Sequence, residues 1–180
     1  MIKDHDRSGW IGASDTHIVM GSWQTAGFRR WFAIKLGLAT NTYTNRYMQT
    51  GTHFEHKILD ALGIKRRDRQ IRIKKLRLRV NLDGEDRAVV HEIKTHKSPK
   101  FKVTRAYWQQ AQVEMFATGK QLVIDAYRLL PEDYENYFRE INLGRHTEHP
   151  VPYDAAWIEQ CFLPRVRVLA DAIKKGVFPE

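Results

Sequence analysis

Apolar and polar residues alternate strictly between Leu76 and Asp83. Positions 76, 78, 80 and 82 carry Leu or Val, whereas positions 77, 79, 81 and 83 carry Arg, Arg, Asn and Asp. A period of two predicts a β-strand with one buried face and one polar face, and Asp83 ends the polar face. Residues 84–87 are polar and contain a glycine, so we expect a turn there and a second strand over residues 88–96.

This predicted hairpin brings possible catalytic side chains together. Glu92 and Lys94 are two residues apart and therefore point to the same side of the second strand. If the hairpin closes, Asp83 joins them, and two carboxylates beside a lysine suit a hard divalent cation and an activated water. The alternative is that these residues are solvated or form weak cross-strand pairs, and on this pattern alone that alternative is the stronger.

Helical periodicity covers much of the remaining chain. We expect helices over residues 16–21, 26–38, 48–62, 104–118 and 154–175. Ser14 or Asp15 can cap the first helix, Gly119 ends the fourth, and Pro164 should bend or interrupt the last. The aromatic residues of the 26–38 helix are expected in the core rather than in a base-stacking platform.

Two of these helices carry polar residues of interest. Glu55 lies on the 48–62 helix, where a glutamate is usually just exposed to solvent. On the 104–118 helix, Tyr107, Gln110 and Glu114 share one face, whereas Gln112 lies off it.

The remaining strands complete the predicted fold. The apolar phase shifts at residues 74–75, so residues 70–82 are expected to form two strand segments joined by a bulge or bend. Further strands are expected over residues 122–130 and 137–143, followed by a loop whose His146 and His149 are not expected to bind metal. The order helix, three strands, helix, strand predicts an α/β domain with a mixed central sheet and flanking helices.

Composition narrows the class of protein. The 180 residues form one expected domain, 1–180, and no apolar run is long enough to span a membrane. A single cysteine, Cys161, excludes an intramolecular disulfide and an all-cysteine metal site. The polar N-terminus does not resemble a signal peptide, so we expect a cytoplasmic protein.

The charge is positive and unevenly distributed. The net charge is +9, and residues 65–79 contain nine Lys or Arg and one acid. Such a run favours phosphate contacts along a nucleic acid, although a generally basic surface is an alternative. Near the N-terminus, Ser14 at a helix start and Arg7 could form an anion site, or Ser14 could be an ordinary N-cap.

Four separated motifs together resemble the lambda exonuclease group and its YqaJ-like viral recombinase relatives, within the PD-(D/E)xK nuclease superfamily. They are the Gly-Ala-Ser-Asp run at 12–15, Gly-Thr-His-Phe-Glu at 51–55, Asp83 with Glu-Ile-Lys at 92–94, and Tyr107 with Gln110 and Gln112. The motifs occur in the order of the family and lie between residues 7 and 130, whereas the rest of the chain matches only loosely. The resemblance implies a restriction-endonuclease-like core.

The resemblance also implies an activity and a metal site. The expected enzyme is a metal-dependent 5′-to-3′ exonuclease that digests linear duplex DNA ends. Asp83, Glu92 and the Ile93 carbonyl would bind Mg²⁺, for which Mn²⁺ can substitute, and Glu55 would complete the site. Lys94 would orient or deprotonate the attacking water, helped by a pKa that can fall in a partly buried site.

The resemblance further implies which residues hold the DNA and which protein acts together with the enzyme. Tyr107, Gln110 and Gln112 would hold the strand, and Arg7 and Ser14 would bind a terminal 5′-phosphate. Asp15 departs from many relatives, and an acid beside such a pocket is unfavourable unless it points away. The family associates with a single-strand annealing protein in phage recombination inside a bacterial host cell.

Rings of three subunits are also typical of the family. The basic run would line the channel of such a ring, and apolar residues of the final helix could form the subunit interface or could cover the sheet instead. They are Trp157, Phe162, Leu169 and Phe178.

Two other functions remain open at this point. One is another nuclease of the superfamily, such as a restriction or CRISPR-associated endonuclease. The other is a catalytically silent DNA-binding protein or inhibitor with the same fold. The complete set of Asp83, Glu92 and Lys94 argues against a silent protein, because folding does not require that combination.

Overall fold

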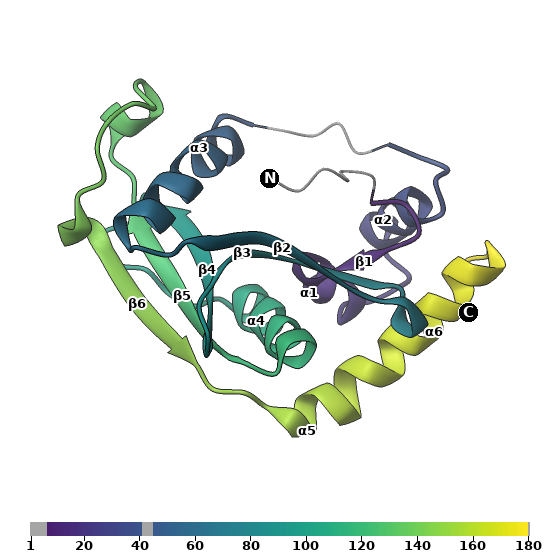
Figure 1. The fold of residues 1–180 in the computed structure, drawn as a ribbon. Coiled ribbons are helices and arrows are strands. Elements are labelled where there is room, and N and C mark those ends of the chain that lie inside the picture. The colour runs from purple at the N-terminus through teal and green to yellow at the C-terminus, as the bar shows by residue number, and fades with distance from the viewer. Residues whose placement is uncertain (1–6, 41–44, 180) are drawn as a thin grey trace.

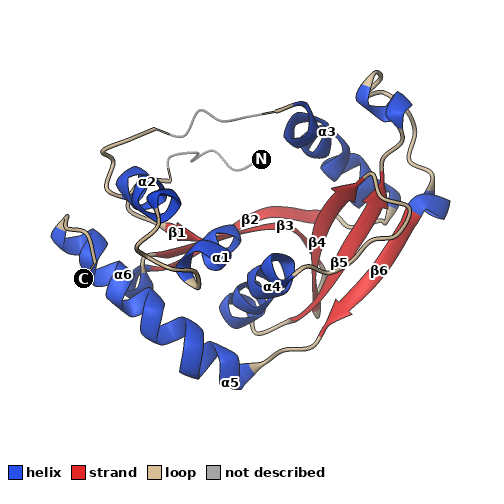
Figure 2. Ribbon diagram, turned by 180° about the vertical axis from the view of Figure 1, so that it is seen from behind, coloured by secondary structure: helices blue, strands red, loops and turns tan. Residues whose placement is uncertain are grey.

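A computed structural model describes residues 7–40 and 45–179 of the chain. Residues 1–6, on which most of the signal-peptide argument rests, lie outside the described part. The structure has a mixed six-stranded sheet with helices on both of its faces (Figures 1 and 2). The α/β class and the mixed sheet are therefore confirmed.

The sheet has a central path of five strands. Its order is β1 (Ile11–Gly12), β3 (Leu78–Glu85), β4 (Val89–His96), β5 (Gln121–Arg128) and β6 (His146–Val151). The β1–β3 and β4–β5 pairs are parallel, whereas β3–β4 and β5–β6 are antiparallel. The sixth strand, β2 (Arg66–Ile73), pairs with β3 in antiparallel fashion.

The phase shift at residues 74–75 marks a chain reversal rather than a bulge or bend. A 3-10 turn over Lys74–Leu76 and Arg77, with φ of +48°, reverse the chain between β2 and β3. The strand before the turn starts at Arg66, four residues earlier than expected. Its basic residues hid this start, because the alternation of apolar residues on which the prediction relied is absent there.

The β3–β4 hairpin closes as expected but only near its turn. The paired positions are Gly84 with His91 and Glu85 with Val90, so the strands separate beyond Gly84. Gly84 lies close to the end of a helix, because an added Cβ would come within 2.6 Å of Leu59 and 3.0 Å of Ile64. The separation starts at Asp83, where the side chain rather than the backbone meets β4.

Helices cover both faces of the sheet (Figure 2). The helices α1 (Thr16–Val19), α2 (Ala26–Lys35), α3 (Arg46–Ala61) and α4 (Arg105–Thr118) lie where they were expected, within a few residues. Ile93 and Tyr127 pack against α3, whereas Val90 and Ile124 belong to the core on the opposite face, under α4. The β3–β4 hairpin is thus held between two helices.

The region after β5 differs from the prediction. Residues 137–143 are not a strand, and Phe138 is 93% exposed. The strand is β6, in the segment that was expected to be a loop. It contains Pro150, a residue that an edge strand tolerates, and this weakened its signal in the sequence.

The C-terminal helical segment covers the sheet. It comprises α5 (Ala155–Trp157), a π-helical turn over Ile158–Phe162, and α6 (Leu163–Lys175), which has Pro164 in its first turn. Trp157, Phe162 and Leu169 are buried within the chain, and Phe178 packs on Phe32 of α2. Trp157, Phe162 and Leu169 thus belong to the domain's own core, as in the alternative that they cover the sheet, whereas Phe178 remains 44% exposed.

None of the helices in the described part of the chain is both long enough and apolar enough to cross a membrane.

Candidate active site

The two halves of the Asp83 and Glu92–Lys94 motif meet where β3 and β4 separate. The Asp83 carboxylate accepts a hydrogen bond of 2.9 Å from the backbone N–H of Ile93. Glu92 is 3% exposed and lies on the side of β4 that faces α4. The expectation that Asp83, Glu92 and Lys94 lie close together therefore agrees with the geometry.

Lys94 is fixed by contacts from two elements. Its Nζ donates to Glu92 Oε1 at 2.6 Å and to Gln110 Oε1 at 3.2 Å. The ring of Tyr107 lies beside the same ammonium group, with its centroid 5.0 Å from Nζ. Tyr107 and Gln110, which share one face of α4, are thus directed to the lysine as their spacing predicts.

Glu114, which was not predicted from the sequence as a site residue, also belongs to this cluster. Glu114 is fully buried on α4, one turn after Gln110. Gln110 Nε2 donates to Glu92 Oε1 at 2.7 Å and to Glu114 Oε1 at 2.8 Å. The shared face with Tyr107 and Gln110 was the available signal, but a glutamate on a helix is usually exposed.

Two buried oxygens of this cluster have no hydrogen-bond donor among the residues that the structure describes. They are Glu92 Oε2 and Glu114 Oε2. A buried carboxylate oxygen without a donor is unfavourable unless a proton or a cation binds there. Carboxylate oxygens are also the ligands that Mg²⁺ prefers, so the residues fit a divalent cation.

The electrostatics of the site reflect its crowded carboxylates. Burial raises the pKa of Asp83 well above its usual value, and the charges of Glu92 and Glu55 raise it further. Burial and the charge of Glu92 likewise raise the pKa values of Glu114 and Glu55. Ionisation of all these carboxyl groups together is thus unfavourable unless a cation binds between them.

The pKa of Lys94 moves opposite to the expectation. Burial disfavours the charged ammonium, but the carboxylates of Glu92 and Asp83 outweigh burial and raise the pKa above its ordinary value. The expectation that the pKa of Lys94 falls in a partly buried site is therefore wrong for this geometry. Lys94 acts in the structure as a hydrogen-bond donor.

A cavity of about 260 Å³ joins the carboxylates to the expected phosphate site. Glu55, Asp83, Gln110 and Glu114 line it together with Arg7 and Ser14, as do several residues that sequence reasoning did not select. Those additional residues are Trp10, Gly12, Ala13, Lys35, Asp68, Arg79, Asn81 and Leu82. The cavity therefore has acidic groups from the hairpin and helices and basic groups from the N-terminal segment, α2 and β3.

Asp15 is not among the residues that line this cavity. Its carboxylate accepts the Gly12 N–H at 2.8 Å and forms a buried ion pair of 2.7 Å with Lys35. The ion pair neutralises the acid that was unfavourable beside a phosphate. Asp15 occupies the N-cap position of α1 without capping it through its side chain.

Gln112 does not belong to the site. It is fully buried, donates to the Pro152 carbonyl at 2.8 Å and accepts the Asp154 N–H at 2.7 Å. Gln112 points to the other side of α4 from Gln110, so the expectation that it contacts DNA is wrong. Its role is to join α4 to the start of the C-terminal helices.

Two groups of ligand-type side chains lie within 4.8 Å of one another in the described residues. They are Glu55, His56 and Asp68 beside the cavity, and Asp125, His146 and Glu148 on β5 and β6. The expected trio of Asp83, Glu92 and Glu55 is not such a group. His146 lies on a strand rather than in a loop, and it contacts Asp125 at 2.8 Å.

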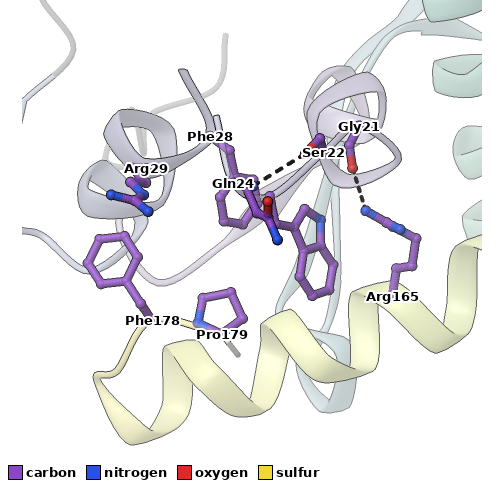
Figure 3. Close-up of a pocket in the computed structure, with 9 residues that line it drawn as sticks. Gly21, Ser22, Gln24, Phe28, Arg29, Arg165, Phe178 and Pro179 are labelled. Carbon is purple, nitrogen blue, oxygen red and sulfur yellow. Dashed lines mark hydrogen bonds between the residues drawn. The ribbon is translucent and has the colours of Figure 1, made fainter. Parts of the chain in front are cut away.

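A larger hollow lies away from the carboxylates. Figure 3 shows it between the turn that follows α1 and the C-terminal residues, with a volume of about 650 Å³. Arg165 lines one side of it, donating to the Gly21 carbonyl and lying over the Trp23 ring. None of the candidate catalytic, metal-binding or DNA-binding residues lines this hollow, so it gives no support to the nuclease chemistry.

Two solved structures share this fold. An alkaline exonuclease from Laribacter hongkongensis is 20% identical with a TM-score of 0.67, and the match covers 94% of this chain and 90% of that one. A phage related exonuclease from Haemophilus somnus 129PT is 17% identical with a TM-score of 0.67, covering 93% and 92%. At these identities the likeness shows the fold.

No protein-family model and no curated protein sequence matched the chain.

Proposed function

We propose that the chain is a metal-dependent 5′-to-3′ exonuclease of the lambda exonuclease and YqaJ-like group, formed by one domain of residues 1–180. The observation that carries the proposal is the convergence of Asp83, Glu92 and Lys94 next to a cavity that also holds Arg7 and Ser14. The shared fold with two exonucleases supports it. The substrate would be the end of linear duplex DNA.

The proposed metal is Mg²⁺, with Mn²⁺ as a substitute. Asp83, Glu92 and the Ile93 carbonyl would hold it, with Glu55 directly or through water. Bound there, the ion would supply a Lewis acid that lowers the pKa of water and offsets charge on the phosphate. The unpaired buried oxygen of Glu92 supports this assignment.

The other side chains of the site would position water and DNA. Lys94, held by Glu92 and Gln110, is placed to orient the attacking water through a donated hydrogen bond. Tyr107 and Gln110 would hold the scissile strand near the carboxylates. Gln110 already forms hydrogen bonds with Lys94, Glu92 and Glu114. To contact DNA, it would have to rearrange, or neighbouring residues would make the contact instead.

The basic side of the cavity would bind the terminal 5′-phosphate. Arg7 and Ser14 line it as the resemblance implies, and the buried Arg79 lies on the same cavity. A guanidinium group can bind phosphate oxygens in pairs, which gives geometric selectivity for a phosphorylated end. The proposed phosphate-binding residues and the carboxylates line the same cavity. This arrangement suits an enzyme that cleaves close to a DNA end.

The basic run would supply non-specific contacts along the duplex, although not with all of its residues. Arg66 and Arg69 are paired with Glu85, and Arg67 is paired with Asp60. Exposed Lys65, Lys74 and Lys75 are better placed for phosphate contacts. A single-strand annealing protein as partner, a ring of three subunits and a cytoplasmic location in a bacterial host are proposed from the resemblance alone.

The topology of the DNA substrate distinguishes the proposed exonuclease from an endonuclease of the same superfamily. The native protein with Mg²⁺ should digest linear duplex DNA and leave covalently closed circular DNA intact. Cleavage of the closed circle would support an endonuclease instead.

A further inference from the structure

Glu114 places a second buried carboxylate beside that of Glu92. Both accept from the same nitrogen, Gln110 Nε2, at 2.7 and 2.8 Å. The two groups come from different elements, α4 and β4, and Gln110 holds them side by side. Each uses one oxygen in this contact and has a second, buried oxygen without a donor.

The local charges favour a cation between these oxygens. Lys94 donates to Glu92 and to Gln110, and in the described part of the chain it makes no hydrogen bond to Glu114. Asp83, Glu55 and Glu114 line the same cavity, and Glu114 is close enough to Asp83 for their charges to interact. Adjacent buried carboxylates repel each other unless a proton or a metal ion is shared between them.

We propose that Glu114 is an additional ligand of the divalent cation, binding through Oε2 beside Glu92 Oε2, with Gln110 as the positioning residue that aligns both carboxylates. The inference deepens the proposed function and rests on it, since it takes the carboxylate cluster to be a cation site. It adds α4 to the elements that already supply proposed ligands, which are the β3–β4 hairpin and α3.

The competing account is that the two carboxylates share a proton and that Glu114 is purely structural. The two accounts differ in what a glutamine at position 114 should do. Glutamine keeps the shape and an oxygen for the contact with Gln110, but it removes the charge that a hard cation requires. The Glu114→Gln variant should therefore fold in either case and lose cation affinity only if Glu114 is a ligand.

The test is calorimetric titration of the full-length protein with Mg²⁺ alone, with no DNA present. Glu114→Gln should bind Mg²⁺ about 10- to 100-fold more weakly than the native protein, the scale seen when groups that support a metal site are removed. Glu140→Gln, which removes one exposed negative charge away from the cavity, should bind as the native protein does. Thermal stabilisation by Mg²⁺ should fall in parallel for Glu114→Gln alone.

A second variant keeps the test decisive if Glu114→Gln does not fold. Glu114→Asp retains the charge but shortens the side chain, so it should bind Mg²⁺ several-fold more weakly than the native protein. Native affinity in either variant would overturn the inference and favour the shared proton. Absence of Mg²⁺ binding by the native protein itself would instead overturn the proposed function together with this inference.

Discussion

The Asp83 carboxylate accepts the backbone N–H of Ile93 across 2.9 Å, although ten residues separate them in the chain. This contact replaces backbone pairing at the point where β3 and β4 separate. It fixes the position of Asp83 relative to Glu92 and Lys94, on either side of Ile93. The Asp83 side chain thus has both a structural contact, to Ile93, and a proposed role in metal binding.

Asp83→Asn separates these two roles. The amide oxygen of asparagine can still accept from Ile93, so the far-ultraviolet circular dichroism should remain native. Loss of the charge should weaken Mg²⁺ binding and slow DNA cleavage by at least about a hundredfold, the scale of one strong transition-state contact. Mg²⁺ titration and a timed digest of linear duplex measure both effects, and native cleavage would exclude Asp83 as a ligand.

Gln110 and Gln112 provide a matched pair of substitutions on one helix. Gln112→Ala should lower the free energy of unfolding, because the buried Pro152 carbonyl and Asp154 N–H lose their partner, at about 1–3 kcal/mol for each group. Its DNA affinity per folded molecule should stay native. Gln110→Ala should instead reduce cleavage, since it releases Lys94, Glu92 and Glu114.

Urea unfolding and fluorescence anisotropy with labelled duplex distinguish the two variants. If Gln112→Ala bound DNA poorly while retaining native stability, Gln112 would contact DNA after all. The assignment of the two glutamines would then be reversed.

The basic side of the cavity predicts a preference for phosphorylated ends. The native protein should digest a 5′-phosphorylated duplex faster than the same duplex with a 5′-hydroxyl. Arg7→Ala should be slow on both and should lose the difference, because the guanidinium no longer pairs with the phosphate. Equal native rates on both ends would exclude this pocket without excluding the nuclease.

The assembly remains a prediction of the resemblance. Three of the four apolar residues considered for an interface are buried in the chain's own core. The structure therefore favours the alternative in which they cover the sheet. Light scattering coupled to size exclusion should give about three times the chain mass for a ring, whereas a single 21.2 kDa species with and without DNA would exclude it.

Much of the fold could be predicted because its elements have strong local signals. The alternation up to Leu82 and the polar turn after it predicted the β3–β4 hairpin. Thr104 caps the start of α4 and Gly119 caps its end, as their capping chemistry predicts. The strand β2 was predicted too short because its outer half is basic on both faces. The strand β6 was missed because its pairing with β5 is a tertiary contact that its own sequence does not reveal.

The candidate site was predictable in its hairpin and less so in its helices. Glu92 and Lys94 follow from a period of two, whereas the direction of Gln112 depends on which face of α4 packs on the C-terminal segment. Glu114 was visible only as a neighbour of Gln110, since burial cannot be inferred from one glutamate. The raised pKa of Lys94 depends on how many carboxylates surround it, a quantity that requires the tertiary structure.

A digestion assay that compares the native protein with Lys94→Ala tests the central claim most directly. Each protein is incubated with linear and covalently closed duplex DNA, with Mg²⁺ or with a chelator, and DNA binding is measured in parallel. The account predicts digestion of linear DNA by the native protein with Mg²⁺ only. It also predicts at least about a hundredfold loss of rate in Lys94→Ala with DNA binding largely retained. Digestion at a near-native rate by Lys94→Ala, or by the native protein without a divalent cation, would contradict the account.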